Sequence, residues 1–159
     1  MKKFICLFFA AIICFSSIFS VNATSDPFSN TDSNTVIVYD NGDYLTISPI
    51  IYIESTTRAA NTKDGHRTYT YSNSSDEVEW IFVINATFSY VYGSSVTCTN
   101  SSYTYTIYKD SWKFSDGSTS HSGGTAYAYG TFKNKVLFIT TKTIDVEAQI
   151  SCDIYGNLS

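Results

Sequence analysis

The side chains that could carry hydrolytic chemistry are few in this sequence. Its histidines are His66 and His121, and the second lies beside Ser122 and five residues after Asp116. In a nucleophilic triad a histidine takes the proton of the hydroxyl or thiol, and an acid orients the histidine. Ser122 or Cys98 would be the nucleophile here. Neither lies in a nucleophile-elbow pattern, and serine is abundant throughout the chain, so chance placement explains the group better. We expect no catalytic residues and no enzymatic activity.

Paired carboxylates could serve a glycosidase, which needs two of them about 5 to 10 Å apart. Asp145 and Glu147 are two positions apart on a predicted strand, so strand geometry separates them by about 7 Å. Asp76, Glu77 and Glu79 form a second acidic group. A water-exposed sheet face accounts for Asp145 and Glu147 without catalysis, and we expect that structural role.

The motif Asp40-Asn41-Gly42-Asp43 offers oxygen atoms that could bind calcium. It lacks a full calcium-loop signature. A hairpin turn accounts for it, because Asn-Gly accepts the positive φ angles that tight hairpins require. The two histidines have no neighbouring second ligand, as a zinc site would need. We therefore expect neither a metal nor another cofactor.

Tyr127 and Tyr129 form the strongest candidate binding site. They alternate with Ala126, Ala128 and Gly130, and successive side chains of a strand face opposite sides. If the small residues pack inward, the tyrosines form an exposed platform on which sugar rings can stack. The alternative is that the tyrosines lie in the core and the alanines outside. The pattern alone leaves both arrangements open.

Residues 80–92 are predicted to form the strand that organises the fold. Even positions are apolar from Trp80 to Tyr92, whereas the odd positions are more polar. This alternation indicates a strand with one buried face. The strand is more than twice the usual length, so we predict a bend or bulge near Asn85 and Ala86.

The other predicted strands are short and separated by turn signals. They are expected at residues 36–39, 44–47, 50–53, 67–71, 96–98, 102–108, 112–114, 118–122, 125–132 and 144–152. Residues 55–65 and 133–135 are predicted to be turns. Many short strands without a convincing helix indicate an all-β fold. We expect an antiparallel two-sheet sandwich, immunoglobulin-like or Greek-key.

The N-terminus has the three regions of a secretory signal peptide. Lys2 and Lys3 precede an apolar run over residues 4–19, and small residues lead to Ala23. The alternative, an uncleaved membrane anchor, fits less well because a spanning helix needs about 20 apolar residues. The expected organisation is a signal peptide at residues 1–23, a flexible leader at 24–35 and a single β-sandwich domain at 36–159.

Charge and composition point to an extracellular protein. Charged residues make up 15% of the chain, against about 25% in typical soluble proteins. The net charge of −4 becomes −6 when Lys2 and Lys3 leave with the signal peptide. Because no basic cluster is apparent, nucleic acid and anionic membranes are poor candidate partners. We expect a secreted protein whose partner is an extracellular protein or a glycan.

Cys98 and Cys152 are the cysteines that remain after removal of the signal peptide. An even number of cysteines in an exported chain predicts a disulfide. Both cysteines also continue apolar strand faces. The alternative is two buried free thiols that pack as small apolar groups.

Several stretches resemble a group of uncharacterised small secreted proteins from low-GC Gram-positive bacteria, many of them gut Clostridia. They are Trp80, residues 85–90, 93–95 and 98–99, Trp112, and residues 122–123, 141–142 and 152–159. The resemblance covers about residues 66–159 and implies export, bacterial origin and one β domain. It brings no activity or catalytic motif.

Together these observations predict a non-enzymatic extracellular interaction module. The alternative is a small carbohydrate-binding module that acts through Tyr127 and Tyr129. A hydrolase that depends on His121 ranks third.

Overall fold

Strands account for most of the described chain, which comprises residues 34–55 and 61–159 of a computed structural model. The predicted signal peptide and nearly all of the predicted leader lie outside the described residues. The described strands are β1 (Thr35–Val38), β2 (Tyr44–Ile47), β3 (Ile51–Ser55), β4 (Asn61–Ser72), β5 (Val78–Val91), β6 (Ser95–Ile107), β7 (Trp112–Ser122), β8 (Thr125–Val136) and β9 (Ile139–Ser151).

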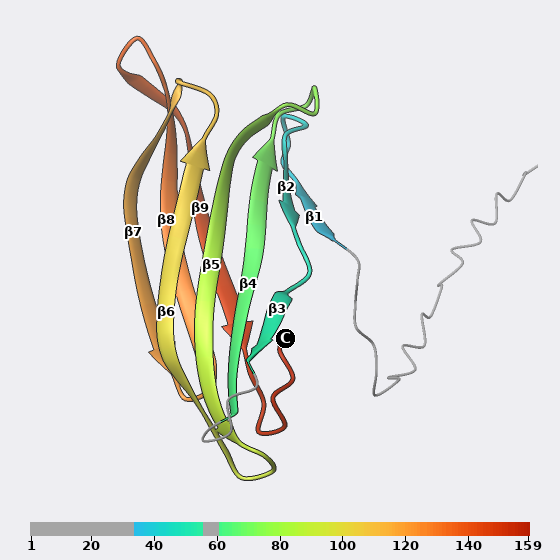
Figure 1. Cartoon of the computed structure of the whole chain (residues 1–159). Helices are drawn as coiled ribbons and strands as arrows, with labels where there is room; N and C mark the ends of the chain where they lie inside the picture. The colour runs from blue at the N-terminus through green and yellow to red at the C-terminus, as the bar shows by residue number, and fades with distance from the viewer. Residues whose placement is uncertain (1–33, 56–60) are drawn as a thin grey trace, which may run out of the picture. The chain divides into compact units, whose positions relative to one another are not determined.

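These strands form two antiparallel sheets that pack as a sandwich (Figure 1). One sheet has the order β1-β2-β4-β5-β6, and β3 joins it by pairing with β4. The other sheet has the order β7-β8-β9. The predicted all-β class and two-sheet antiparallel sandwich are confirmed. Apart from the pairing of β2 with β4, every pair of hydrogen-bonded strands is consecutive in the sequence. Each sheet is therefore largely a β-meander.

The long strand β5 lies between β4 and β6 and has one buried face. Its even-numbered side chains from Trp80 to Phe88 are buried, as the alternation predicted, whereas Tyr92 beyond the strand end is exposed. The predicted irregularity near Asn85 and Ala86 is present as a bulge just beyond them, between Thr87 and Phe88, and β5 itself is continuous. The irregularity lies in β6, where the register shifts opposite Thr87 and Phe88. A bulge in the neighbouring strand provides local twist without breaking β5.

The strand β4 begins earlier than the sequence pattern predicts. Residues 61–65, which the sequence favours as a turn, are its first five positions. They pair with β5 on one side and with β3 on the other. This stretch is polar and lacks alternation, so its strand conformation depends on the partners on both sides rather than on its own side chains.

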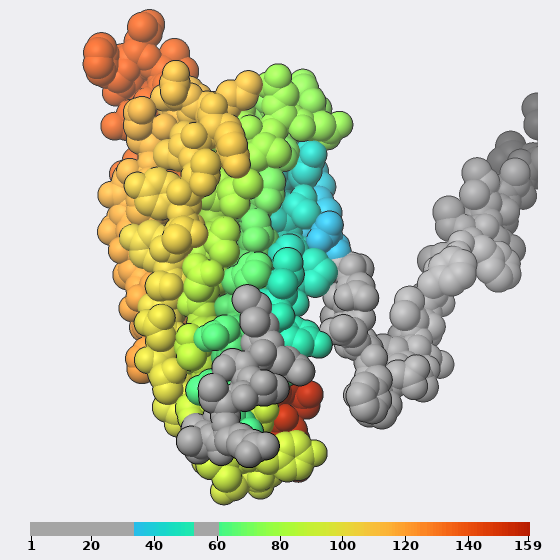
Figure 2. All heavy atoms as spheres, viewed as in Figure 1, coloured from blue at the N-terminus to red at the C-terminus, as the bar shows by residue number. Residues whose placement is uncertain are grey.

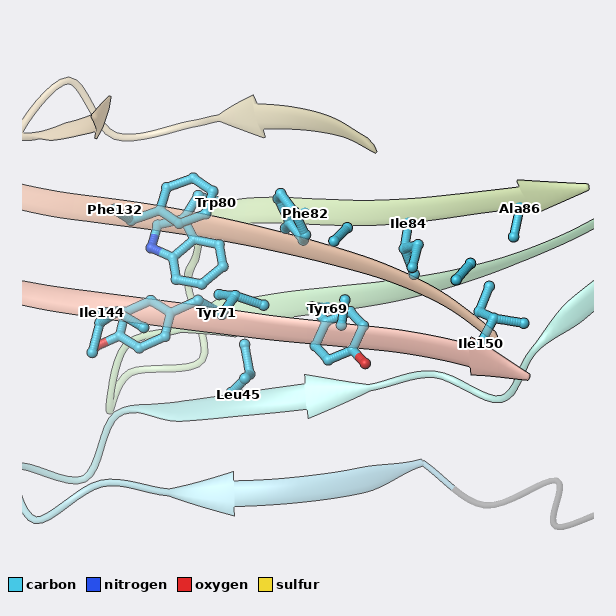
Figure 3. Packing of buried hydrophobic residues seen from close by; sticks show 14 of the residues in the cluster. Leu45, Tyr69, Tyr71, Trp80, Phe82, Ile84, Ala86, Phe132, Ile144 and Ile150 are labelled. Atoms are coloured by element: carbon cyan, nitrogen blue, oxygen red, sulfur yellow. The ribbon is translucent and has the colours of Figure 1, made fainter. Parts of the chain in front are cut away.

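The core is built around stacked aromatic rings (Figure 3). Trp80 of β5 stacks on Phe132 of β8 with ring centroids 3.9 Å apart, and on Tyr71 of β4 at 5.0 Å. The facing strand β8 contributes small residues beside these rings. A Cβ atom at Gly130 would lie 2.8 Å from Phe82 Cε2, which is closer than packed carbon atoms approach. The close approach of the two sheets therefore requires a small residue at Gly130.

Candidate functional site

The outer face of the three-stranded sheet displays Tyr127 and Tyr129. Ala126, Ala128 and Gly130 are buried against the opposite sheet, whereas Tyr129 is 39% exposed and Tyr127 is partly exposed. The alanines therefore pack inward and the tyrosines lie outside, which was the condition for an aromatic platform. The deciding factor is the aromatic content of β5, because the Phe82 ring leaves no room for a side chain at the facing position Gly130.

Polar side chains flank both tyrosines across the sheet. Tyr129 lies between Ser118 of β7 and Glu147 of β9, and Tyr127 lies between Ser120 and Gln149. We call these six residues the tyrosine face: Ser118, Ser120, Tyr127, Tyr129, Glu147 and Gln149. The sequence did not identify the serines or Gln149 as part of a site, because the pairing register is not visible in a single strand.

Tyr129 is a hydrogen-bond donor within the tyrosine face. Its hydroxyl donates to Glu147 Oε1 at 3.5 Å. Partial loss of solvation and the nearby Glu147 carboxylate raise the pKa of Tyr129 above its ordinary value. The predicted carboxylate pair also lies on this side of the sheet, and Asp145 accepts a hydrogen bond of 2.7 Å from the hydroxyl of Thr131. Both carboxylates therefore accept hydrogen bonds at a water-exposed surface.

The acidic turn before β2 binds a lysine of this chain. Lys142 Nζ lies 2.8 Å from Asp43 Oδ2 and 3.2 Å from Asn41 Oδ1, and it also donates to the Tyr71 hydroxyl. Tyr71 in turn donates to Asp43 Oδ2 at 2.6 Å. The position beside Asp43 that a cation would take is occupied by an ammonium group. Within residues 34–55 and 61–159, no group of three or more His, Cys, Asp or Glu side chains is arranged to hold a metal ion.

The hydrogen-bonded cluster of Asp43, Tyr71 and Lys142 connects the two sheets through charged groups. Burial would raise the pKa of Asp43, but hydrogen bonds from Lys142, Tyr71 and Asn41 outweigh it and lower the pKa to about 2. Burial and the bond to Asp43 raise the pKa of Tyr71 well above its ordinary value. Asp43 is therefore ionised and Tyr71 is neutral at physiological pH, so the cluster joins β2 and β4 to β9.

The second acidic group, Asp76, Glu77 and Glu79, is held by side chains of neighbouring segments. Glu77 pairs with Lys109 at 2.9 Å. Glu79 accepts a hydrogen bond of 2.6 Å from Trp112 Nε1, and Asp76 accepts one of 2.9 Å from the Tyr44 hydroxyl. Each carboxylate thus has a structural partner.

The histidine, serine and acid of the possible triad do not bond to one another. His121 and Ser122 are adjacent on β7, so their side chains face opposite sides. Asp116 Oδ1 accepts from the backbone N–H of Gly117 at 2.8 Å. The buried Cys98 donates to the carbonyl of Asn100 at 3.2 Å. His66 belongs to β4, in the other sheet. The hydrolytic arrangement drawn from the sequence is not assembled.

Cys98 and Cys152 are buried free thiols, so the predicted disulfide is wrong in this structure. Both cysteines face inward as predicted. Their backbone N–H groups bond to adjacent carbonyls of one turn, Gly123 and Gly124. Each thiol donates a hydrogen bond to a backbone carbonyl in its own segment. Burial raises the pKa of both thiols, and that of Cys152 is raised to about 11. A high pKa depletes the thiolate that disulfide formation requires.

We expect two free thiols per molecule in a chain that lacks residues 1–23. The measurement is a thiol titration of protein unfolded in denaturant without reductant, with a reduced sample as the reference. Because both thiols are protonated and enclosed, they should survive purification in air. A count of zero before reduction and two after it would show a bridge between Cys98 and Cys152.

Comparison with known proteins adds no relative. No family model matches the chain, and no curated protein or solved structure matches it. The resemblance to secreted clostridial proteins therefore stays a prediction. Across the part of the chain that the structure describes, there is no helix with the length and apolar character needed to span a membrane.

One exposed segment was missed by sequence reasoning. The turn predicted at residues 133–135 is wrong, because β8 continues to Val136 and the chain reverses at Leu137 and Phe138. Four apolar residues in a row without Gly, Asn or Pro did not resemble a turn. The sequence signal that could have identified this segment is the unbroken apolar run at residues 136–139, which has lysines on both sides.

Proposed function

We propose that this protein is a secreted, non-enzymatic interaction module that binds carbohydrate through the tyrosine face. The observation that carries the proposal is the outward orientation of Tyr127 and Tyr129 above an inward row of small residues. Aromatic rings of this kind stack on the C–H faces of sugars, while neighbouring polar groups bond to the hydroxyls.

The geometry of the face suits a glycan that lies along β8. The two tyrosines are two positions apart on one strand, so their Cα atoms are about 7 Å apart. Neither ring contacts another aromatic ring among the described residues, and Tyr129 is exposed while Tyr127 is partly exposed. Ser118 and Ser120 can donate or accept on one side of the glycan. Glu147 accepts on the other side, and Gln149 does both.

Charge on the tyrosine face selects the class of glycan. Glu147 belongs to the face, and Asp145 lies one rung further along the same side of β9. A sulfated or carboxylated glycan would meet these like charges, which disfavours its binding. We therefore propose neutral polysaccharides as the ligands. The two carboxylates serve as hydrogen-bond acceptors, and a bound polysaccharide should remain uncleaved.

Replacing both rings, Tyr127→Ala/Tyr129→Ala, should weaken binding to neutral polysaccharides about tenfold or more. Two stacking contacts of about 0.5–1.5 kcal/mol each disappear together with the buried ring area. Affinity electrophoresis in gels that contain individual polysaccharides, followed by a glycan array, measures the change.

The matched control is Tyr108→Ala, because Tyr108 is an exposed tyrosine outside the tyrosine face. It should retain full binding. Equal binding by the wild-type chain and the double variant would refute the platform. If the wild-type chain binds no glycan at all, carbohydrate is the wrong partner class. Release of reducing ends during the incubation would contradict the non-enzymatic assignment.

A further inference from the structure

The end of the β8–β9 hairpin is an exposed apolar apex. We call residues 136–139 the hairpin apex: Val136, Leu137, Phe138 and Ile139. Leu137 is 84% exposed and Phe138 is 100% exposed, and the two flanking residues are also exposed. Figure 2 shows this end of the hairpin standing clear of the neighbouring strands. Single exposed apolar residues are ordinary, but four in succession at a projecting end indicate an interaction surface.

The backbone of the apex is strained. Val136 pairs with Ile139, so Leu137 and Phe138 form a two-residue turn with φ angles of 46° and 72°. Bulky residues rarely adopt this left-handed region, and turns of this kind favour Asn-Gly. Here two large apolar side chains occupy the turn and point into solvent. Neither folding nor solubility accounts for that choice, so the strain points to a binding role.

Lysines lie directly behind the apex. Lys135 is exposed, one position before Val136. Lys133 lies opposite Lys113 of β7 in the ladder. Like charges directly opposite each other destabilise a sheet. In the described part of the chain, none of these three lysines forms an ion pair. We call Lys113, Lys133 and Lys135 the lysine collar.

Along the β8–β9 hairpin itself, lysine is the charged residue nearest the apex. Lys142, further along β9, is already engaged by Asp43 and does not belong to the lysine collar. Asp110 lies in the β6–β7 turn beside Ser111, whose carbonyl accepts from Lys135 N at 2.8 Å. On the outer face of the sheet, Asp116 of β7 and Asp145 of β9 both pair with Thr131, one rung beyond Lys133 on the side away from the apex. Lys133 and Lys135 therefore lie nearer the apex than these two carboxylates. Charges further away are screened, because the Debye length is about 8 Å at physiological ionic strength.

We propose that the hairpin apex inserts into the surface of a bilayer that contains anionic lipids. The order along the hairpin, an apolar end followed by cations, matches the order of acyl chains and phosphate groups in one leaflet. Leu137 and Phe138 enter the acyl boundary, and the collar lysines contact the phosphates while their stems lie along apolar surface. A protein groove or a second copy of this chain would account for the apex but not for the unpaired lysines behind it.

This inference is independent of the tyrosine face and differs from an expectation drawn from the sequence. The sequence alone predicts that anionic membranes are poor partners, because it shows no basic cluster. The collar combines lysines from two strands that become neighbours only through the β7–β8 pairing.

The test is co-sedimentation of a chain lacking residues 1–23 with two kinds of vesicle, phosphatidylcholine alone and phosphatidylcholine mixed with phosphatidylglycerol. Removing residues 1–23 matters because the apolar signal segment would itself bind lipid. The wild-type chain should sediment with the mixed vesicles and much less with the neutral ones. Leu137→Asn/Phe138→Gly should lose at least tenfold in partition. Lys133→Gln/Lys135→Gln should lose about fivefold per lysine on the mixed vesicles only.

The Asn-Gly variant also separates binding from folding. It installs the residues that this turn prefers, so its thermal midpoint should equal or exceed that of the wild-type chain. Val38→Ser is the matched control, since it removes an exposed apolar side chain from β1 and should retain binding. The inference is overturned if the wild-type chain ignores both vesicles or if the Asn-Gly variant binds as well as wild type. Self-association that disappears in this variant, without vesicle binding, would make a second copy the occupant and likewise overturn it.

Discussion

Phe132→Ala is expected to lower the free energy of unfolding by about 3–5 kcal/mol, the cost of removing a fully buried phenylalanine. Phe132 has no exposed surface and stacks on Trp80 at 3.9 Å. It also meets Phe114 edge-on at 5.2 Å. These rings come from both sheets, so a cavity here weakens the contact between them. Urea unfolding followed by tryptophan fluorescence measures the loss, since Trp80 lies against the cavity.

Phe138→Ala provides the matched control for this change. It deletes the same atoms from a phenylalanine that is fully exposed, so the free energy of unfolding should change by less than about 0.5 kcal/mol. If Phe132→Ala does not fold, Phe132→Leu should still unfold at lower urea concentration than the wild-type chain. A loss below about 1 kcal/mol for Phe132→Ala would show that the stacked rings do not hold the sheets together.

Asp43→Asn is expected to destabilise the protein by about 2 kcal/mol at neutral pH and to flatten its acid dependence. In the folded protein the pKa of Asp43 is lowered from 3.8 to about 2. Each unit of this difference corresponds to about 1.4 kcal/mol of folding free energy. Because the folded-state pKa is lowered, this stability is fully present above pH ~4 and is lost as the pH falls from about 4 towards 2. Urea unfolding at pH 7 and along that acid range gives both quantities.

An exposed ion pair serves as the comparison for Asp43→Asn. Glu77 and Lys109 are as close as Asp43 and Lys142, 2.9 Å against 2.8 Å, but they are exposed to water. Glu77→Gln should therefore leave stability almost unchanged. The proposed role of Asp43 would be contradicted if Asp43→Asn and wild type lost stability in parallel between pH 4 and 2. A double-mutant cycle that combines Asp43→Asn with Lys142→Met measures the interaction energy between these two side chains.

Local alternation was sufficient to predict strand faces. In β5 the buried side was evident from Trp80 to Phe88, and in β9 from Ile144 to Ile150. Asn41-Gly42 likewise predicted the first hairpin, because the conformational freedom of these residues is local. Residues 61–65 and 133–135 were incorrectly assigned to turns, since pairing with neighbouring strands overrode their weak strand propensity.

Cross-strand relations could not be predicted from one sequence. Lys142 meets Asp43 across 99 positions of the chain, and the pairing of Lys113 with Lys133 depends on the β7–β8 register. A shift of one residue in that register would move every partner to the other face. The state of Cys98 and Cys152 was equally beyond reach, because inward-facing thiols can be bridged or separate depending on local hydrogen bonds.

For the candidate site, the sequence by itself determined that Tyr127 and Tyr129 share one side of a strand and that small residues occupy the other. It did not determine which side faces water. The tertiary structure decided this, because the rings of Phe82 and its neighbours fill the space between the sheets and leave no room for a side chain at Gly130. The polar partners of the tyrosines, and the position of the hairpin apex ahead of its lysines, were decided in the same way. Both arise only when separate strands pair.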